Sequence, residues 1–190
     1  MGKNFSANNL GQRKKSDFYE TPYSMTWQLL ERETFDKTKK ILEPSCGDGA
    51  ILKVLRDIGY NVVGKDLSLG NDFLKEKEKY DTIITNPPFS LALEFILKAK
   101  ELCNKLVLLL PLSYLHGKER YDKIYNDNIF PLSKVYVFTR YPLLGEPLRN
   151  DGKYNTGMMV YGWFVWNKNH VGEPVIRWID NNDYILKRGE

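Results

Sequence analysis

The 190-residue sequence is poor in cysteine and histidine, the residue types that cross-link small secreted proteins and bind transition metals. Its two cysteines, Cys46 and Cys103, lack the spacing of a disulfide framework or a zinc site. The two histidines, His116 and His170, have no cysteine or histidine neighbour at ligand spacing. We therefore expect no bound metal and a reducing compartment.

Long apolar runs and a strong excess of charge are also missing. No stretch of about 18 apolar residues could span a membrane, and no charged-then-apolar leader is visible, so we expect a soluble cytoplasmic protein. The net charge of +4 is modest, and charge alone does not identify nucleic acid as the partner. The sequence leaves the oligomeric state open.

The basic residues are nevertheless clustered. Residues 1–15 are expected to form a flexible basic segment, and its Arg13-Lys14-Lys15 cluster fits a phosphate clamp and a solvated tail equally well. Residues 141–156 form a long connection rich in proline and glycine, which is typical of functional loops and of disordered segments, and contact with substrate is one hypothesis for it. Five further cations would be well placed if their loops flank the active face: Lys118, Arg120, Arg140, Arg149 and Lys153.

Apolar segments of strand type alternate with segments of helix type along the rest of the chain. This alternation predicts an α/β fold with a doubly wound, mostly parallel Rossmann-like sheet, an antiparallel strand near the C-terminus, and ligands at the carboxyl ends of its strands. The run 106–110 is apolar without alternation, which indicates a strand buried on both faces. Strands are expected near 41, at 61–66, near 82, and at 106–110, 135–138, 158–166 and 175–178; helices are expected at 26–33, near 50, and at 91–102 and 118–125.

The strand near residue 82 runs directly into Asn86-Pro87-Pro88-Phe89. Proline has a fixed φ and no N–H, so the backbone at this corner is stiff and presents carbonyl oxygens. The Asn86 amide oxygen and the Pro87 carbonyl could accept both hydrogens of one exocyclic –NH₂ group. The Phe89 ring would then cover the face of the heterocycle, a stacking contact that contributes roughly 1–3 kcal/mol per base. The motif therefore predicts a site for a planar nitrogen base.

A second motif lies upstream, where a short strand from Ile41 leads into a Gly-x-Gly turn and a helix. This arrangement typically opens a nucleotide-binding βαβ unit, and glycine is needed because a Cβ would block close approach of the ligand. Glu43 at the strand end would repel a pyrophosphate, so a cationic, amine-bearing ligand fits better. The candidate residues of the turn are Glu43, Pro44, Ser45, Cys46, Gly47 and Gly49.

Two acidic residues follow the next strand. Asp66 stands near the ~20-residue spacing from the glycine turn that is expected of a ribose-binding carboxylate. Asp72-Phe73 is an acidic and aromatic pair that could bind and cover an adenine. Either acid alone is more typical of a solvated loop, but their order along the chain favours a binding function.

Together these motifs resemble the S-adenosylmethionine-dependent methyltransferases that modify adenine N6 in DNA. The order of the motifs is similar to that of the family's gamma group, and the compact chain looks like a phage-type or orphan member. Its early segment also looks like the family's N-terminal cofactor motif, which implies cofactor contacts for Tyr19, Thr21 and Pro22. The resemblance implies S-adenosyl-L-methionine as the cofactor, bound in part by Asn86, and one catalytic domain over 16–190 without a separate target-recognition domain.

The resemblance names the chemistry more securely than the substrate. Asn-Pro-Pro-[Phe/Tyr] similarly marks enzymes that methylate cytosine N4, ribosomal RNA bases and protein glutamine, all of which carry a planar –NH₂ group. We expect transfer to adenine N6 in DNA, with an RNA base or a protein glutamine as the alternative acceptor. A degenerate fold that only binds nucleic acid or a partner protein is a third hypothesis, less favoured because both motifs are intact.

Overall fold

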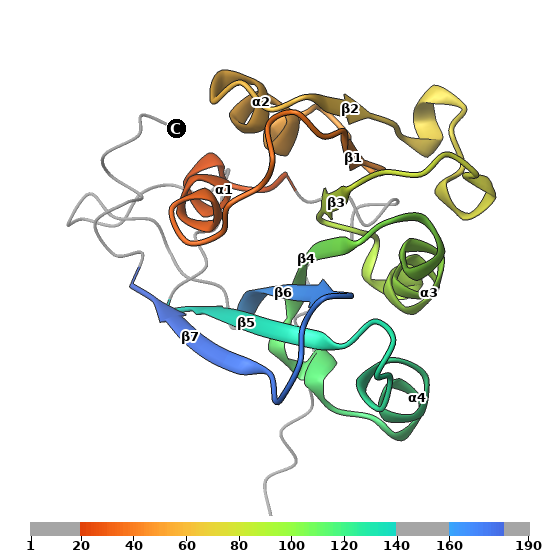
Figure 1. Cartoon of the computed structure of the whole chain (residues 1–190). Coiled ribbons are helices and arrows are strands. Elements are labelled where there is room, and N and C mark those ends of the chain that lie inside the picture. Colours follow the sequence, from red (N-terminus) through yellow and green to blue (C-terminus); the bar gives the residue numbers. More distant parts are fainter. Residues whose placement is uncertain (1–19, 140–159, 181–190) are drawn as a thin grey trace, which may run out of the picture.

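The computed structural model describes residues 20–139 and 160–180 (Figure 1). Seven strands form one sheet in the order β2-β1-β3-β4-β6-β5-β7. All neighbouring strands pair in parallel except for β6, which runs antiparallel to both β4 and β5. The strands are β1 (Ile41–Glu43), β2 (Val62–Gly64), β3 (Thr82–Thr85), β4 (Lys105–Pro111), β5 (Leu132–Phe138), β6 (Tyr161–Asn167) and β7 (Val175–Ile179).

Helices cover both faces of this sheet, as the sequence alternation predicts. On one face α1 (Tyr23–Leu30) and α2 (Ala50–Asp57) pack through Met25, Leu29 and Ile51 against the strands. On the other face Phe95 and Ile96 of α3 (Ala92–Leu102) pack beside the segment that contains α4 (Lys118–Arg120). The mostly parallel, doubly wound α/β fold is therefore confirmed.

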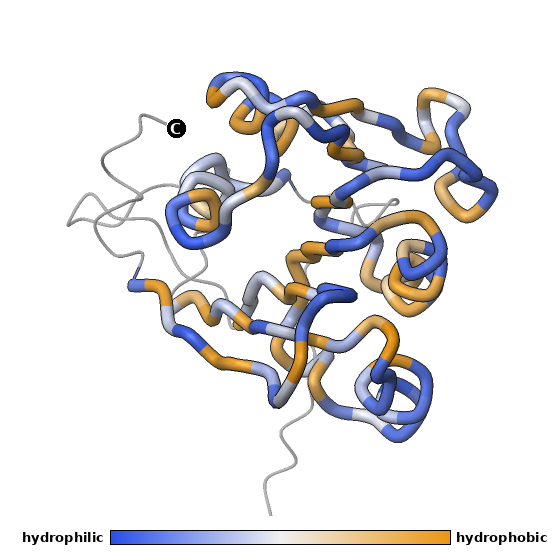
Figure 2. Tube along the Cα trace, viewed as in Figure 1, coloured by the Kyte–Doolittle hydropathy of each residue, from blue (hydrophilic) through white to orange (hydrophobic). Residues whose placement is uncertain are grey.

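The central strand β4 is buried on both faces, because residues 106–110 are each at most 1% exposed. Figure 2 shows this strand as largely hydrophobic and the segment at α4 as largely hydrophilic. Trp163 and Trp166 of β6 are fully buried in the same sheet. They are core residues, as their apolar surroundings in the sequence predict.

Several element boundaries differ from the sequence prediction. Helix α1 begins at Tyr23, directly after Pro22, and ends at Leu30, so the expected span 26–33 is displaced toward the N-terminus. Proline suits a helix start because the first N–H groups have no partner within the helix. Glu33 lies beyond the helix end and is buried. Lysines from β4 and β5 pair with its carboxylate and so compensate its buried charge. Only one turn of the expected helix 118–125 is α-helical, and Tyr121–Tyr125 continues it as a π-helix.

The order in which the strands are added to the sheet changes side at β1, although β1, β2 and β3 all run parallel. The chain passes from β1 outward to β2 and returns to β3 on the other side of β1. The return contains two 3₁₀ turns, η1 (Leu67–Leu69) and η2 (Phe73–Lys75), where an α-helix more often covers such a crossover. In doubly wound sheets a ligand binds where the strand order reverses, outside the carboxyl ends of the strands.

Candidate active site

A cavity of about 660 Å³ lies at this reversal point. Glu43 is the last residue of β1, Asp66 follows β2, and Asn86 follows β3, so three adjacent strand ends contribute to its wall. The structure places eleven of the predicted site residues along the cavity: Thr21, Glu43, Pro44, Ser45, Cys46, Gly47, Asp66, Asp72, Phe73, Asn86 and Pro88.

Other predicted residues support the cavity without lining it. Pro22 is buried at the start of α1, and Pro87 is buried within the proline corner. Gly49 caps α2 with φ +86°, a left-handed conformation that favours glycine. Phe89 lines a second cavity. Tyr19, the basic N-terminal segment and the 141–156 connection lie outside the described residues.

The motif search missed part of the wall. Leu67 and Leu69 belong to the crossover after β2, where no regular pattern marks them. Phe95 belongs to α3, and its ring centroid lies 4.7 Å from that of Phe73. Its position could have been anticipated, because Phe95 is an apolar residue one turn into the helix that follows the proline corner. The remaining lining residues outside the prediction are Glu20, Asp48, Ala50, Ile51, Ser68, Asn71, Leu74 and Leu91.

The Asp66 carboxylate joins the glycine turn to the crossover after β2. It accepts hydrogen bonds from the Gly47 backbone N–H (3.0 Å) and from the N–H and hydroxyl of Ser68 (2.8 and 2.7 Å). Burial alone would raise the pKa of Asp66, but these hydrogen bonds outweigh it and hold the pKa below its ordinary value. Asp66 is therefore an ionised acceptor beside the cavity.

Glu43 is a buried acid of a different kind. It is 2% exposed, and its Oε2 atom has no hydrogen-bond partner among the described residues. Burial raises the pKa of Glu43 to about 9, and the nearby Asp66 carboxylate also raises it, against a hydrogen bond from the Leu52 backbone and the charge of Arg56. The carboxyl group is therefore mostly protonated at neutral pH when no cation lies beside it.

The cavity wall carries acidic side chains and no basic ones. Glu20, Glu43, Asp48, Asp66 and Asp72 line it, whereas none of the described lining residues is lysine, arginine or histidine. Such a wall repels phosphate groups and suits a ligand that carries positive charge and hydroxyl donors. Because burial and the nearby carboxylates raise the pKa of the Cys46 thiol, this residue suits a packing role better than a nucleophilic one.

Polar contacts hold the proline corner against the rest of the cavity. The Ser45 hydroxyl donates to the Asn86 backbone carbonyl (3.3 Å) and lies 2.7 Å from the Thr85 hydroxyl. The Asn86 Nδ2 group donates to the Thr21 hydroxyl oxygen (3.2 Å). The Pro88 backbone carbonyl accepts a hydrogen bond from the Leu91 backbone N–H (2.9 Å). The Thr21 contact fixes the plane of the Asn86 amide, and hence the direction of its carbonyl oxygen.

Thr21 therefore acts on Asn86 as a positioning residue, which a conservative series can test. Thr21→Val keeps the side-chain shape and removes the acceptor, so we expect the rate of any reaction that depends on the Asn86 carbonyl oxygen to fall about 2–10-fold, the worth of one hydrogen bond. Thr21→Ser retains the hydroxyl and should recover most of the loss. Equal activity of the valine and serine variants would show that the hydroxyl has no such role.

The described residues hold no group of three or more His, Cys, Asp or Glu side chains arranged for a metal ion. Among the helices of the same residues, none is long and apolar enough to cross a membrane.

Comparison with known proteins gives structural matches only, since no protein-family model and no curated protein sequence matches this chain. One similar structure, from Vibrio vulnificus, is described as a type I restriction enzyme modification subunit (15% identity, TM-score 0.56, 90% of this chain and 48% of that one). Another, from Listeria monocytogenes, is described as a class I S-adenosylmethionine-dependent methyltransferase (14% identity, TM-score 0.59, 84% and 65%). A third, from Pyrococcus horikoshii, is described as an RNA methyltransferase (14% identity, TM-score 0.52, 77% and 82%).

At these identities the matches establish the fold, which this chain shares with proteins described as methyltransferases. The chain spans about half the length of the Vibrio vulnificus subunit.

Proposed function

We propose that this protein transfers a methyl group from S-adenosyl-L-methionine to the exocyclic amine of a nucleic-acid base, with adenine N6 in DNA as the first choice. The observation that carries the proposal is the placement of Asn86-Pro87-Pro88-Phe89 at the end of β3, beside an acidic cavity at the reversal point of the sheet. The methyltransferase fold of the similar structures supports the same activity.

The cavity fits this cofactor better than a dinucleotide. S-adenosylmethionine carries an ammonium group, a sulfonium group and ribose hydroxyls, which complement the acidic wall and the buried Glu43 Oε2 atom. We expect Asp66 to accept the ribose hydroxyls, and Phe73 to pack against the adenine beside Phe95. The volume of about 660 Å³ lies within the ~300–1,000 Å³ range of small-molecule sites.

The proline corner would activate the acceptor through geometry. The lone pair of an exocyclic amine is delocalised into its ring, and the neutral amine is too weak an acid for a general base to help. The Asn86 amide oxygen and the Pro87 carbonyl accept its two hydrogens, which favours a tetrahedral nitrogen and localises the lone pair. When bound, the cofactor supplies an electrophilic methyl group on its sulfonium. Transfer would form the N–CH₃ bond as the S–CH₃ bond breaks, so that the donor leaves as a neutral thioether and the methylated amine loses one proton to solvent. Holding nitrogen and methyl in line can lower the barrier by up to ~7–11 kcal/mol.

For a base within a duplex, the acceptor must also leave the stack at a cost of a few kcal/mol. Stacking on Phe89 and the two amine contacts would offset that cost. An RNA base and a protein glutamine remain the alternative acceptors, because each carries an –NH₂ group on an sp² carbon.

A labelling experiment tests the proposal. The protein is incubated with tritiated S-adenosylmethionine and, separately, with duplex DNA, single-stranded DNA, RNA and cell protein, and the modified nucleosides or residues are then identified. We expect N6-methyladenine in DNA. Label in RNA or protein alone would overturn the first choice of acceptor. No transfer and no calorimetric heat with the cofactor would favour a fold that only binds a partner.

Proton release provides an independent test of the cofactor assignment. A cation beside Glu43 favours the ionised carboxylate, whose pKa in the free protein is raised to about 9. Cofactor binding at pH 7.5 should therefore release a proton, so that the calorimetric heat varies with the ionisation enthalpy of the buffer. Glu43→Gln, which cannot ionise, should remove this variation and weaken binding. Persistence of the variation in Glu43→Gln would assign the proton to another group.

A further inference from the structure

A second cavity, of about 380 Å³, begins at the proline corner. Asn86 and Pro88 line the first cavity, whereas Phe89, the next residue, lines the second. The corner therefore contributes consecutive residues to two cavities. Leu93 and Glu94, near the start of α3, form part of the second wall.

The opposite wall is built on the segment that follows β4. Tyr114 is 7% exposed, and its backbone carbonyl accepts the Tyr125 hydroxyl (2.9 Å). The Arg120 guanidinium lies over the Tyr114 ring, 4.6 Å from its centroid, and its Nε donates to the His116 carbonyl (2.7 Å). The arginine and the tyrosine thus give this part of the wall both a positive charge and an aromatic ring.

Gly117 makes this arrangement possible. Its φ of +129° disfavours any side chain, and a Cβ built there would lie 2.8 Å from Arg120 Nη2. The absence of a side chain allows the arginine to fold back over the tyrosine ring. A side chain at residue 117 would therefore strain the turn and displace the Arg120 guanidinium from its position over the Tyr114 ring.

The two cavities differ in charge. The first has acidic side chains without basic ones, whereas the second is lined by Lys118 and Arg120 as well as by Glu94 and Glu119. Two of these charges are paired with residues outside the cavity wall, Glu119 with Lys123 (2.7 Å) and Lys118 with Asp122, and both are exposed pairs on the α4 segment. A wall that combines aromatic rings with cations suits a planar base attached to a phosphate, whereas a glutamine side chain needs neither feature.

We propose that the second cavity binds the nucleotide that carries the acceptor amine, with Phe89 and the Tyr114–Arg120 pair against the base and with Lys118 and Arg120 near its phosphate. This inference rests on the proposed function and names residues that would hold the nucleic-acid substrate. It also separates the roles of the two cavities, with the methyl donor in the acidic one and the acceptor in the mixed-charge one.

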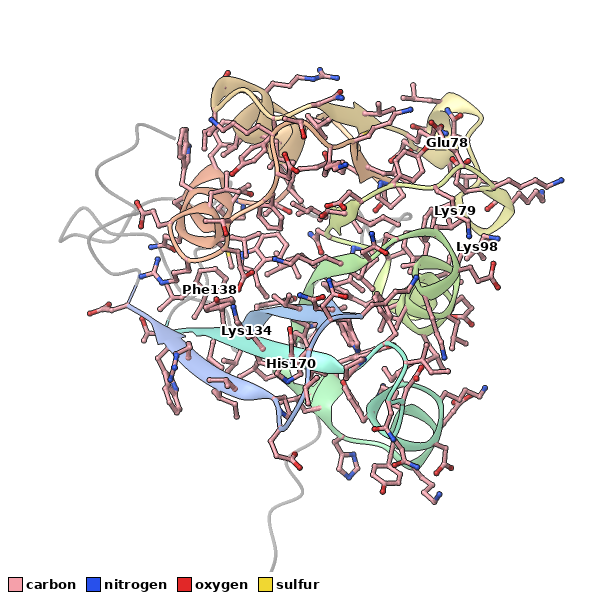
Figure 3. All side chains as sticks on the ribbon, viewed as in Figure 1. Glu78, Lys79, Lys98, Lys134, Phe138 and His170 are labelled. Atoms are coloured by element: carbon pink, nitrogen blue, oxygen red, sulfur yellow. The ribbon has the colours of Figure 1, made fainter. Side chains whose placement is uncertain are left out.

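Lys118→Ala and Arg120→Ala test the assignment, with Arg120→Lys to separate charge from stacking. Arg177→Ala on β7 and Lys98→Ala on α3 (Lys98 is labelled in Figure 3) are matched controls, because neither residue lines the first or the second cavity. Fluorescein-labelled DNA oligonucleotides serve as the binding probe over a range of salt concentrations. Calorimetry with S-adenosylmethionine and thermal unfolding verify that each variant is folded and retains the first cavity.

For Arg120→Ala we expect the apparent KM for DNA to rise about tenfold, with cofactor affinity unchanged. The slope of log affinity against log salt should fall by about one for each lysine or arginine removed. A merely structural role would not change that slope. Arg120→Lys should keep the slope and lose part of the affinity, because lysine retains the charge without the planar group.

The outcomes separate this inference from the proposed function. DNA methylation by the wild type, with unchanged KM and salt slope in both alanine variants, would overturn the nucleotide assignment and leave the methyltransferase proposal intact. Label confined to protein would overturn the nucleotide assignment as well. Absence of transfer to every acceptor, together with absence of cofactor binding by the wild type, would overturn the proposed function itself.

Discussion

Asn86→Ala is expected to lower methyl transfer by about 10²–10³-fold, the loss typical when one group that stabilises a transition state is removed. In the proposed mechanism the amide oxygen contacts an amine hydrogen, and that contact strengthens as the nitrogen becomes tetrahedral. Affinity for S-adenosylmethionine should stay nearly unchanged, because the acidic wall and the glycine turn are intact. Single-turnover rates and calorimetry measure the two quantities separately.

Two further variants sharpen this experiment. Asn86→Asp keeps an acceptor oxygen and loses the donor to Thr21, so it should retain more activity than Asn86→Ala. Asn128→Ala is the matched control, since Asn128 is exposed and lies in neither cavity wall. If Asn86→Ala lost cofactor binding and turnover in equal measure, Asn86 would be a structural residue of the cofactor cavity.

Glu33→Ala is expected to cost about 3 kcal/mol in the free energy of unfolding, because it removes the buried carboxylate at the centre of an ionic cluster and leaves its partly exposed lysines unpaired. The Glu33 side chain is 3% exposed and binds Lys105 Nζ (3.0 Å), the Tyr136 hydroxyl (2.6 Å) and Lys134 Nζ. Lys134 extends from β5 and is labelled in Figure 3. The loss should lower Tm by about 6–12 °C in a domain of this size, as measured by thermal unfolding.

Glu101→Ala is the control for this prediction. Glu101 forms an exposed ion pair with Lys98 at the end of α3, and such pairs contribute at most about 1 kcal/mol. A similar fall in Tm for Glu33→Ala and Glu101→Ala would show that the buried cluster has no special role in stability.

The cluster should also make stability depend on pH. Burial alone would raise the pKa of Glu33, but the hydrogen bonds from Lys134, Tyr136 and Lys105 outweigh it and hold the pKa below its ordinary value of 4.5. The stabilisation is therefore fully present above about pH 4.5 and is lost as pH falls through the lowered pKa of the folded state. Thermal unfolding of wild type and Glu33→Gln should accordingly converge below pH 4.5. A Tm difference that stayed constant down to pH 3 would contradict this cause.

Local chemistry in the sequence was sufficient to predict the parallel sheet, the glycine turn and half of the residues that line the first cavity. Gly49 can adopt the left-handed conformation that its turn requires, Pro88 fixes its own φ, and polar residues that follow parallel strands meet at one edge of the sheet. Glu43, Asp66 and Asn86 could therefore be assigned to one site without knowledge of their distances.

Only the tertiary structure decided which distant residues act together. The insertion of β6 between β4 and β5, the Thr21–Asn86 hydrogen bond, the Glu33 cluster and the second cavity each join segments far apart in the chain. The residue pattern within a strand or helix specifies which face is buried, but it does not specify the partner. Partner choice depends on packing of the whole chain, because each such contact must offset the entropy lost when the long intervening segment is closed into a loop.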